Sequence, residues 1–465
     1  MQVLTIAMIL SVSVGSYLTG IGVLPKLARY IPEILSIVAA AYVVLAGPRD
    51  RFRFVPARYW IAFVATGLVV ICGIAAHAVA PGPLIGGIRF YLRAIPFFFL
   101  PAVYPYTDQQ LGRQLKVLLA ISLLQLPISA YQRLLIMLAH RWSGDPVIGT
   151  MVISSIMSIF LIGSICIATG FMLRQRLSIP VFLMLFVIFI IPTTINETKA
   201  TLFLLPIGLT TSFLIGSAPG KRLRVGMFAI ALVAIFGAIF VPIYNHFSTI
   251  DNPYPFTIMQ FFGDPHMVAK TIDKDAGVGT REEVGRGDAL IVPLREYASS
   301  PMDLLVGAGI GNASKSSVGN QQAGAYYQVF GRYAETSSAG TFILEIGVLG
   351  SALVVWLYWM IFRDAAFVAT HDKGIKGSIA LGWVGMTAVM AIATFYKQTL
   401  GFESLSYLFW YFSGLIAAAT MQITGSSSTP HQKATRAPTE SRNRQGPATG
   451  RRPRKSHVRA AGQIQ

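Results

Sequence analysis

The sequence predicts an all-α membrane protein of about twelve transmembrane helices, and three observations lead to this prediction. The 465 residues are 54% hydrophobic and only 12% charged, with a mean hydropathy of +0.58. Apolar runs near the roughly 20 residues that cross a bilayer recur along nearly the whole chain. Lysine and arginine gather in every second connection between these runs. A soluble core of this size does not need so much apolar sequence, so we expect a bilayer around most of the chain.

The first apolar run is expected to be a membrane span rather than a cleaved leader. No Lys or Arg precedes it and no small-residue cleavage pattern follows it, in contrast to a secretory signal. The twelve expected spans are 3–23, 31–47, 59–80, 85–103, 118–139, 147–173, 179–194, 200–215, 225–244, 339–362, 377–394 and 405–421.

Positive charge in short connections indicates which helix ends face the cytoplasm. Basic residues follow the second, fourth, sixth, eighth and tenth spans, which predicts that both chain termini are cytoplasmic. The connection with Lys26 and Arg29 is the clearest exception, and Arg141 is a milder one. The residues that obey the rule are Arg49, Arg51, Arg53, Arg58, Arg113, Lys116, Arg174, Arg176, Lys221, Arg222, Arg224, Arg363, Lys373 and Lys376.

Two polar segments divide the chain further. The segment 245–338 holds ten of the twenty acidic residues and, by the alternation of charge, is external (periplasmic); its length calls for a folded subdomain or a lid. The segment 424–465 carries nine Lys or Arg against Glu440 alone. We expect it to be a disordered cytoplasmic tail attracted to anionic lipid rather than to nucleic acid, because no aromatic residues lie among its charges. The transmembrane parts are then 1–244 and 339–423.

Several familiar kinds of site are not indicated by the sequence. Cys72 and Cys166 both fall inside expected spans, where they are small apolar packing residues. "GAGIGN" at 307–312 lacks the spacing and the βαβ setting of a nucleotide-binding loop, so we expect a glycine-rich turn. The histidines lack metal-ligand spacing with one another, and we expect the acidic cluster of Asp273, Asp275, Glu282 and Glu283 to be a solvated surface.

Charged residues near the external ends of the spans are the first functional candidates. Arg89 and Arg93 are four residues apart, hence on one helix face, and either reach the lipid headgroups or form a cationic lining for a lipid-linked phosphate. Glu197 and Lys199 lie in the hairpin between two short spans, as a local ion pair or as part of a site. Lys397 and Glu403, in the last external loop, are weaker candidates.

Within the external segment, a short helix is expected from about Gly287 to Tyr297, followed by the glycine-rich turn. Arg286 precedes this helix and Arg295 lies on it. A cation at a helix N-terminus gains nothing from the helix dipole, so Arg286 is the more interesting of the two. Glu335 stands where the polar segment turns back into apolar sequence, in "ETSSAGTFILEIGVLG" at 335–350, whose Thr and Ser residues are also expected to cap the tenth span.

The order of these parts resembles the O-antigen ligase and O-antigen polymerase family of bacterial membrane glycosyltransferases. The shared parts are about twelve spans, a large external loop after the ninth, an arginine that opens the loop helix, a glycine-rich turn, and a polar pair followed by "LEIGVLG" at 344–350. The architectural similarity covers nearly the whole chain except the tail. The local similarity is confined to about three short motifs.

Members of this family have a His-Asn/Ser/Gln pair, then nine residues, then Gly-x-x-Gly. Counted back from Gly347 and Gly350, the pair falls on Thr336 and Ser337, so the serine fits and Thr336 replaces the histidine. Glu345 matches an acidic residue that the family often has before its glycine.

Two further motifs of the family concern cations. Its Ser-Arg pair at the outer ends of the seventh and eighth spans falls on Thr198 and Lys199, which keeps the charge but loses the bidentate geometry of arginine. Its loop arginine matches Arg286.

The resemblance implies transfer of a glycan from an undecaprenyl-pyrophosphate carrier to an acceptor sugar hydroxyl at the periplasmic face of the inner membrane, with no cofactor, nucleotide or metal. Glu335, beside the replaced histidine, is the expected general base, and cations stabilise the departing pyrophosphate. The expected catalytic residues are Glu335, Arg286 and Lys199, and the expected substrate-binding residues are Arg89, Arg93, Arg295, Thr336, Ser337 and Glu345.

A polymerase of exopolysaccharide or O-antigen is slightly favoured over a ligase, because the His motif is altered. Two alternatives stay open. A flippase or secondary transporter would place ionisable residues near mid-membrane on broken helices, which Arg133 in the fifth span fits best. A non-catalytic assembly partner of a polysaccharide export complex would use the external loop as a docking surface.

Overall fold

We describe a computed structural model of the chain, which covers residues 1–45, 55–139, 146–249, 257–264, 284–314 and 323–427. Throughout these ranges the secondary structure is helical, without a strand, as the sequence predicts. Among them, nine helices are long and apolar enough to cross a membrane, and the pair α5 and α6 passes the same test together. Two shorter apolar helices, α9 and α10, add to these. Each of the twelve expected spans overlaps one of these elements.

The apolar helices follow the order of the expected spans. They are α1 (Gln2–Leu10) continuing through a π turn (Ser11–Gly15) into α2 (Ser16–Gly20), α3 (Ile31–Leu45), α4 (Ala57–His77), α5 (Pro81–Leu92), α6 (Ile95–Val103), α7 (Asp108–Leu138), α8 (Ser154–Leu173), α9 (Ile179–Ile195), α10 (Thr201–Gly216), α11 (Arg222–Thr249), α17 (Ser338–His371), α18 (Ile375–Tyr396) and α19 (Glu403–Ser427).

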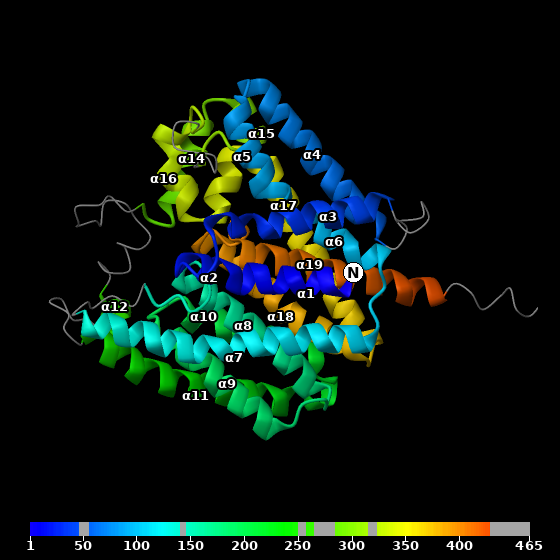
Figure 1. The fold of residues 1–465 in the computed structure, drawn as a ribbon, viewed down its shortest axis with the longest axis vertical. Coiled ribbons are helices and arrows are strands. Elements are labelled where there is room, and N and C mark those ends of the chain that lie inside the picture. Colours follow the sequence, from blue (N-terminus) through cyan, green and yellow to red (C-terminus); the bar gives the residue numbers. More distant parts are fainter. Residues whose placement is uncertain (46–54, 140–145, 250–256, 265–283, 315–322, 428–465) are drawn as a thin grey trace, which may run out of the picture. The chain divides into compact units, whose positions relative to one another are not determined.

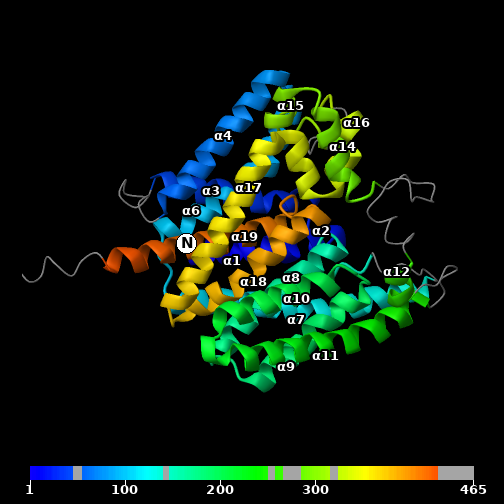
Figure 2. The same cartoon turned by 180° about the vertical axis from the view of Figure 1, so that it is seen from behind.

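The polar segment between α11 and α17 contains short helices of its own. They are α12 (Ile258–Gly263), α14 (Asp288–Tyr297), α15 (Pro301–Val306) and α16 (Tyr327–Thr336). The helix expected over 287–297 is confirmed as α14. Figures 1 and 2 show α12, α14 and α16 toward one end of the bundle, here called the loop end, and Met1 toward the opposite end, here called the N-terminal end.

The core of the residues 1–424 lies where α8, α10, α17 and α18 meet, with α19 alongside. Glycines allow the closest approach: a Cβ at Gly382 would stand 2.5 Å from the carbonyl oxygen of Cys166, and one at Gly170 would stand 2.2 Å from that of Ser378. Small residues of this kind let membrane helices pack backbone to backbone. Cys166, on α8, is buried, as expected of a packing residue, whereas Cys72, on α4, is exposed.

The fourth expected span is broken. α5 and α6 meet at a bend of 40°. Pro96 has no N–H to donate to the turn before it, so the helical ladder is interrupted there. The carbonyl of Arg93 loses its intrahelical donor and instead accepts from the Ser36 hydroxyl of α3. Arg93 lies at this break, between the end of α5 and the start of α6.

α17 is also bent, at Gly347, whose φ of +66° is left-handed. The glycine-rich turn packs directly against this bend: the amides of Ala308 and Gly309 donate to the carbonyls of Leu344 and Glu345, at 2.8 and 3.1 Å. A Cβ at Gly347 would stand 2.4 Å from the Leu305 oxygen, so only glycine fits the crossing. The polar segment is thereby joined to the first turns of α17 by main-chain hydrogen bonds.

Candidate functional site

A cavity of about 410 Å³ with several charged side chains is lined by residues from seven separate stretches of the chain. Most of its charged residues come from helix ends or from the connections between helices, which is where loops carry binding groups. The lining residues are Ser16, Arg29, Gly86, Arg89, Phe90, Arg93, Val152, Ser314, Glu335, Gln398, Gly401, Phe402 and Glu403. We call this cavity the arginine pocket.

Two of its arginines are held by carboxylates. The Nε of Arg89 donates to Glu33 of α3, and the Nη1 of Arg93 donates to Glu403 of α19 at 2.9 Å. Arg93 also donates to the carbonyl of Gly401, whereas its Nε is buried without a hydrogen-bond partner. These pairs offset part of the cost of placing arginines at the edge of the membrane and fix their direction.

The third arginine is held differently. Arg29 donates to the hydroxyl of Tyr30 at 2.8 Å and lies over the same ring, 4.9 Å from its centroid. Arg89 lies 5.2 Å from that ring. Within the described residues, Arg29 forms no ion pair at 4 Å or less. It is therefore the arginine of the pocket whose charge is least compensated by a carboxylate.

Glu335, near the end of α16, lines the same cavity as the three arginines. Its Oε1 accepts from the hydroxyl of Tyr327 at 3.0 Å, and the carboxylate is otherwise exposed. Burial and the bond to Glu335 raise the pKa of Tyr327, so the phenol stays a donor. Gln398 also lines the cavity. Its side-chain amide donates to Thr341 Oγ1 at 2.7 Å and to the Ala334 carbonyl.

An apolar cavity of about 270 Å³ adjoins the arginine pocket and shares Phe90 with it. It lies between α4, α5, α6, α17 and α19, and it is lined chiefly by aromatic and aliphatic side chains such as Trp60, Phe99 and Trp410. A charged compartment and a hydrocarbon-like compartment therefore meet at one residue. That combination suits a ligand with an anionic head and an apolar tail.

The residues of the family-like pair do not line the pocket. Ser337 is fully buried and caps α17, accepting from the amide of Gly340 at 3.1 Å. Thr336 ends α16 and donates to the Arg332 carbonyl at 2.8 Å. The capping expected for this stretch is therefore found at Ser337.

Glu345 is fully buried and lies beneath the glycine-rich turn. Its Oε1 accepts from the amide of Ser314 at 3.0 Å. Ser314 does line the pocket, so Glu345 acts on the pocket through the backbone that it anchors.

The other predicted cations do not line the pocket. The guanidinium of Arg286 lies 4.9 Å from the ring of Tyr396, two residues before Gln398, and its Nε is buried without a hydrogen-bond partner. The ammonium of Lys199 lies 5.7 Å from the ring of Tyr244. Arg295 is exposed on α14. Of the predicted residues, the structure brings together Arg89, Arg93 and Glu335.

Arg133, a transporter-like candidate from the sequence, is buried and forms an ion pair with Glu197 at 2.9 Å. Its guanidinium also lies over Phe247, 4.5 Å from the ring centroid, and donates to that residue's carbonyl at 3.1 Å. Glu197 is thus paired with a residue of α7 that is distant in the sequence, whereas the sequence indicated Lys199 as its local partner. The contact ties the hairpin between α9 and α10 to α7.

Other sequence candidates lie elsewhere. The imidazole of His77 contacts Asp303 at 3.0 Å and Tyr326 at 3.4 Å, which joins α4 to α15 and α16. Several lie outside the described residues: His140, His266, Asp273, Asp275, Glu282, Glu283, Arg49, Arg51, Arg53, Arg141 and the tail from residue 428.

Sequence reasoning did not assign Arg29, Glu33 or Gln398 to a site. Arg29 could have been found from the sequence, because it lies in a connection where the positive-inside rule disfavours a cation. Such an exception indicates a candidate functional residue. Glu403 was noticed as a charged loop residue. Gln398 carried no signal, because an uncharged residue in a short loop is ordinary.

Comparisons with known proteins give no relative: no family model matches the sequence, and no curated protein is significantly similar to it.

Proposed function

We propose that this protein is a membrane glycosyltransferase that transfers glycan repeats from an undecaprenyl-pyrophosphate carrier to an acceptor glycan, as a polymerase or ligase of exopolysaccharide or O-antigen. The observation that carries the proposal is the arginine pocket, in which three arginines face one exposed carboxylate beside an aromatic cavity. The pyrophosphate would bind Arg29, Arg89 and Arg93, and the first part of the polyprenyl chain would enter the cavity beyond Phe90.

The chemistry follows from these positions. The acceptor hydroxyl attacks the anomeric carbon, the bond from that carbon to the pyrophosphate oxygen breaks, and the carrier leaves as undecaprenyl pyrophosphate. Glu335 takes the proton of the hydroxyl, with Tyr327 orienting the carboxylate. Negative charge grows on the leaving oxygen, where the arginine cluster stabilises it. Arg286 and Lys199 stay proposed as cations of the surrounding surface, with Arg295 at the glycan entrance.

The proposal includes a topology of twelve crossings in a bacterial inner membrane. The long helices and the bent pair supply ten crossings, and α9 and α10, of 17 and 16 residues, supply two more. Helices of that length are shorter than the roughly 20 residues of a full span, which local thinning of the bilayer accommodates. Both termini are then cytoplasmic and the pocket faces the periplasm.

Glu335→Gln in purified protein, reconstituted with lipid-linked repeats, tests the role of Glu335. We expect the transfer rate to fall roughly 100-fold or more, since general-base catalysis contributes about 10²–10⁴. Glu296→Gln, an exposed carboxylate on α14, is the matched control and leaves the rate unchanged. Unchanged transfer by Glu335→Gln would remove the base from the mechanism.

One observation favours a second candidate, a secondary transporter of an anionic substrate. The break between α5 and α6 puts Arg93 at a discontinuous span, as transporter sites often require. Arg133, by contrast, already has a partner in Glu197. Counterflow of a labelled lipid-linked glycan across vesicles without any lengthening of the glycan would favour transport over transfer. A non-catalytic assembly partner would show neither transport of the labelled glycan nor its transfer.

A further inference from the structure

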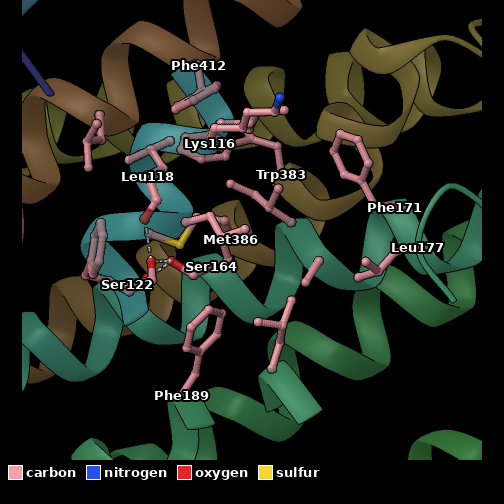
Figure 3. A pocket seen from close by; sticks show the side chains of 18 of the residues that line it. Lys116, Leu118, Ser122, Ser164, Phe171, Leu177, Phe189, Trp383, Met386 and Phe412 are labelled. Atoms are coloured by element: carbon pink, nitrogen blue, oxygen red, sulfur yellow. Dashed lines mark hydrogen bonds between the residues drawn. The ribbon is translucent and has the colours of Figure 1, made fainter. Parts of the chain in front are cut away.

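A separate cavity of about 330 Å³ lies between α7, α8, α9, α18 and α19 (Figure 3). It shares no lining residue with the arginine pocket. Its walls are almost wholly apolar, with Phe189, Trp383 and Met386 turned into it (Figure 3). Its volume falls at the lower end of the roughly 300–1,000 Å³ of small-molecule sites.

The hydroxyls in this cavity are already engaged. Ser122 and Ser164 lie 2.8 Å apart, and each also lies within hydrogen-bond distance of a carbonyl of its own helix, at 2.9 and 3.0 Å. A cavity whose hydroxyl groups are already paired favours hydrocarbon over water. The occupant expected from the lining is therefore an apolar chain.

The cavity is open toward the apolar surface of the protein. Leu119, on its α7 wall, is 38% exposed, whereas Trp383 at the inner side is only 3% exposed. In a bilayer, the neighbours of such an opening are lipid acyl chains, so a chain can enter sideways from the membrane.

The charged residues among the lining are Lys116 and Arg176, and both are positive. Lys116 is exposed on the first third of α7, which begins at the N-terminal end (Figures 1 and 2). Arg176, after the end of α8, gives one N–H to the Lys373 carbonyl at 3.1 Å and keeps its other donors for a ligand. Two cations at an otherwise apolar cavity are complementary to an anionic lipid headgroup.

We propose that this cavity binds one acyl chain of an anionic membrane phospholipid, with the headgroup phosphate between Lys116 and Arg176. The cavity is distinct from the arginine pocket, and it shares one lining residue, Phe409, with the apolar cavity beside that pocket. The bound lipid holds α7 against α8 and α18 from the membrane side.

Trp383 provides a direct test, since bromine on a lipid tail quenches tryptophan only at close range. The protein is reconstituted in phosphatidylcholine vesicles that contain increasing fractions of brominated-tail phosphatidylglycerol or brominated-tail phosphatidylcholine. The fluorescence of the parent protein minus that of Trp383→Phe gives the fluorescence of Trp383. The same subtraction with Trp359→Phe reports a bilayer-facing tryptophan, which is 59% exposed, as the control.

We expect Trp383 to be quenched at an anionic-lipid fraction on the order of tenfold lower than the phosphatidylcholine fraction, because each cation near a headgroup favours anionic lipid. Trp359 responds equally to both lipids. Lys116→Gln with Arg176→Gln removes the preference at Trp383, and Arg113→Gln, a basic residue of α7 outside the lining, keeps it. Trp383 unquenched while Trp359 is quenched, or quenched equally by both lipids in the parent protein, would overturn the proposal.

Discussion

Arg29 is a cation in a connection where the alternation of basic loops disfavours one, and its position in the arginine pocket gives the physical reason. The guanidinium stacks on Tyr30 and has no carboxylate within ion-pair distance among the described residues. Arg89 and Arg93, in contrast, share their charge with Glu33 and Glu403. An anion entering the pocket therefore gains most from Arg29, since no internal carboxylate must be displaced.

We accordingly predict that Arg29→Gln lowers the transfer rate roughly 100-fold, the effect typical of removing one preorganised donor to a developing negative charge. Arg29→Lys restores part of the rate, because the charge returns without the planar donor fork. The measurement is the initial rate with lipid-linked substrate. Lys26→Gln, in the same connection but outside the lining, is the control; equal losses in both variants would mean that only the net charge of the loop matters.

At the scale of elements, two interrupted helices build the site. The break before α6 presents Arg93, and the bend of α17 at Gly347 receives the glycine-rich turn that carries Ser314. Both interruptions satisfy their freed main-chain groups, one with Ser36 and the other with the amides of the turn. A helix interruption inside a membrane protein survives only under that condition.

Gly347→Ala is expected to lower the free energy of unfolding by at least about 1–2 kcal/mol, since a left-handed alanine costs that much before any clash with Leu305. Gly237→Ala, in α11 with open space around the added methyl, is expected to raise it by about 0.5–1 kcal/mol. Denaturant titration in detergent measures both. A neutral Gly347→Ala would argue against a rigid contact between the turn and α17.

At the scale of the whole molecule, the loop end and the N-terminal end are opposite faces of one bundle (Figures 1 and 2). Ser299, after α14, and Ser178, before α9, are both exposed and belong to connections on opposite sides in the proposed topology. Three proposed crossings, α9, α10 and α11, separate them, so their accessibility tests whether the number of crossings between them is odd.

We predict that Ser299→Cys, in a background with Cys72→Ser and Cys166→Ser, reacts with a membrane-impermeant maleimide added to intact spheroplasts. Ser178→Cys is expected to react only after the membrane is opened. Gel-shift labelling measures both. Reaction of both residues from the same side would contradict the proposed number of crossings between them.

Four results follow from the sequence alone: the helical class, the order of the apolar segments, the helix α14 of the polar segment, and the candidates Arg89, Arg93 and Glu335. These results follow from hydropathy, from the spacing of apolar residues and from the distribution of charge, all of which can be seen in short stretches of sequence. Capping by Ser337 was already expected from its local sequence. The fold was needed to bring Arg29, Glu33, Gln398 and Glu403 to these candidates and to place Glu345 beneath the turn that it anchors. These assignments depend on contacts between residues hundreds of positions apart, such as Arg93 with Glu403, and such contacts leave no periodic trace in one sequence.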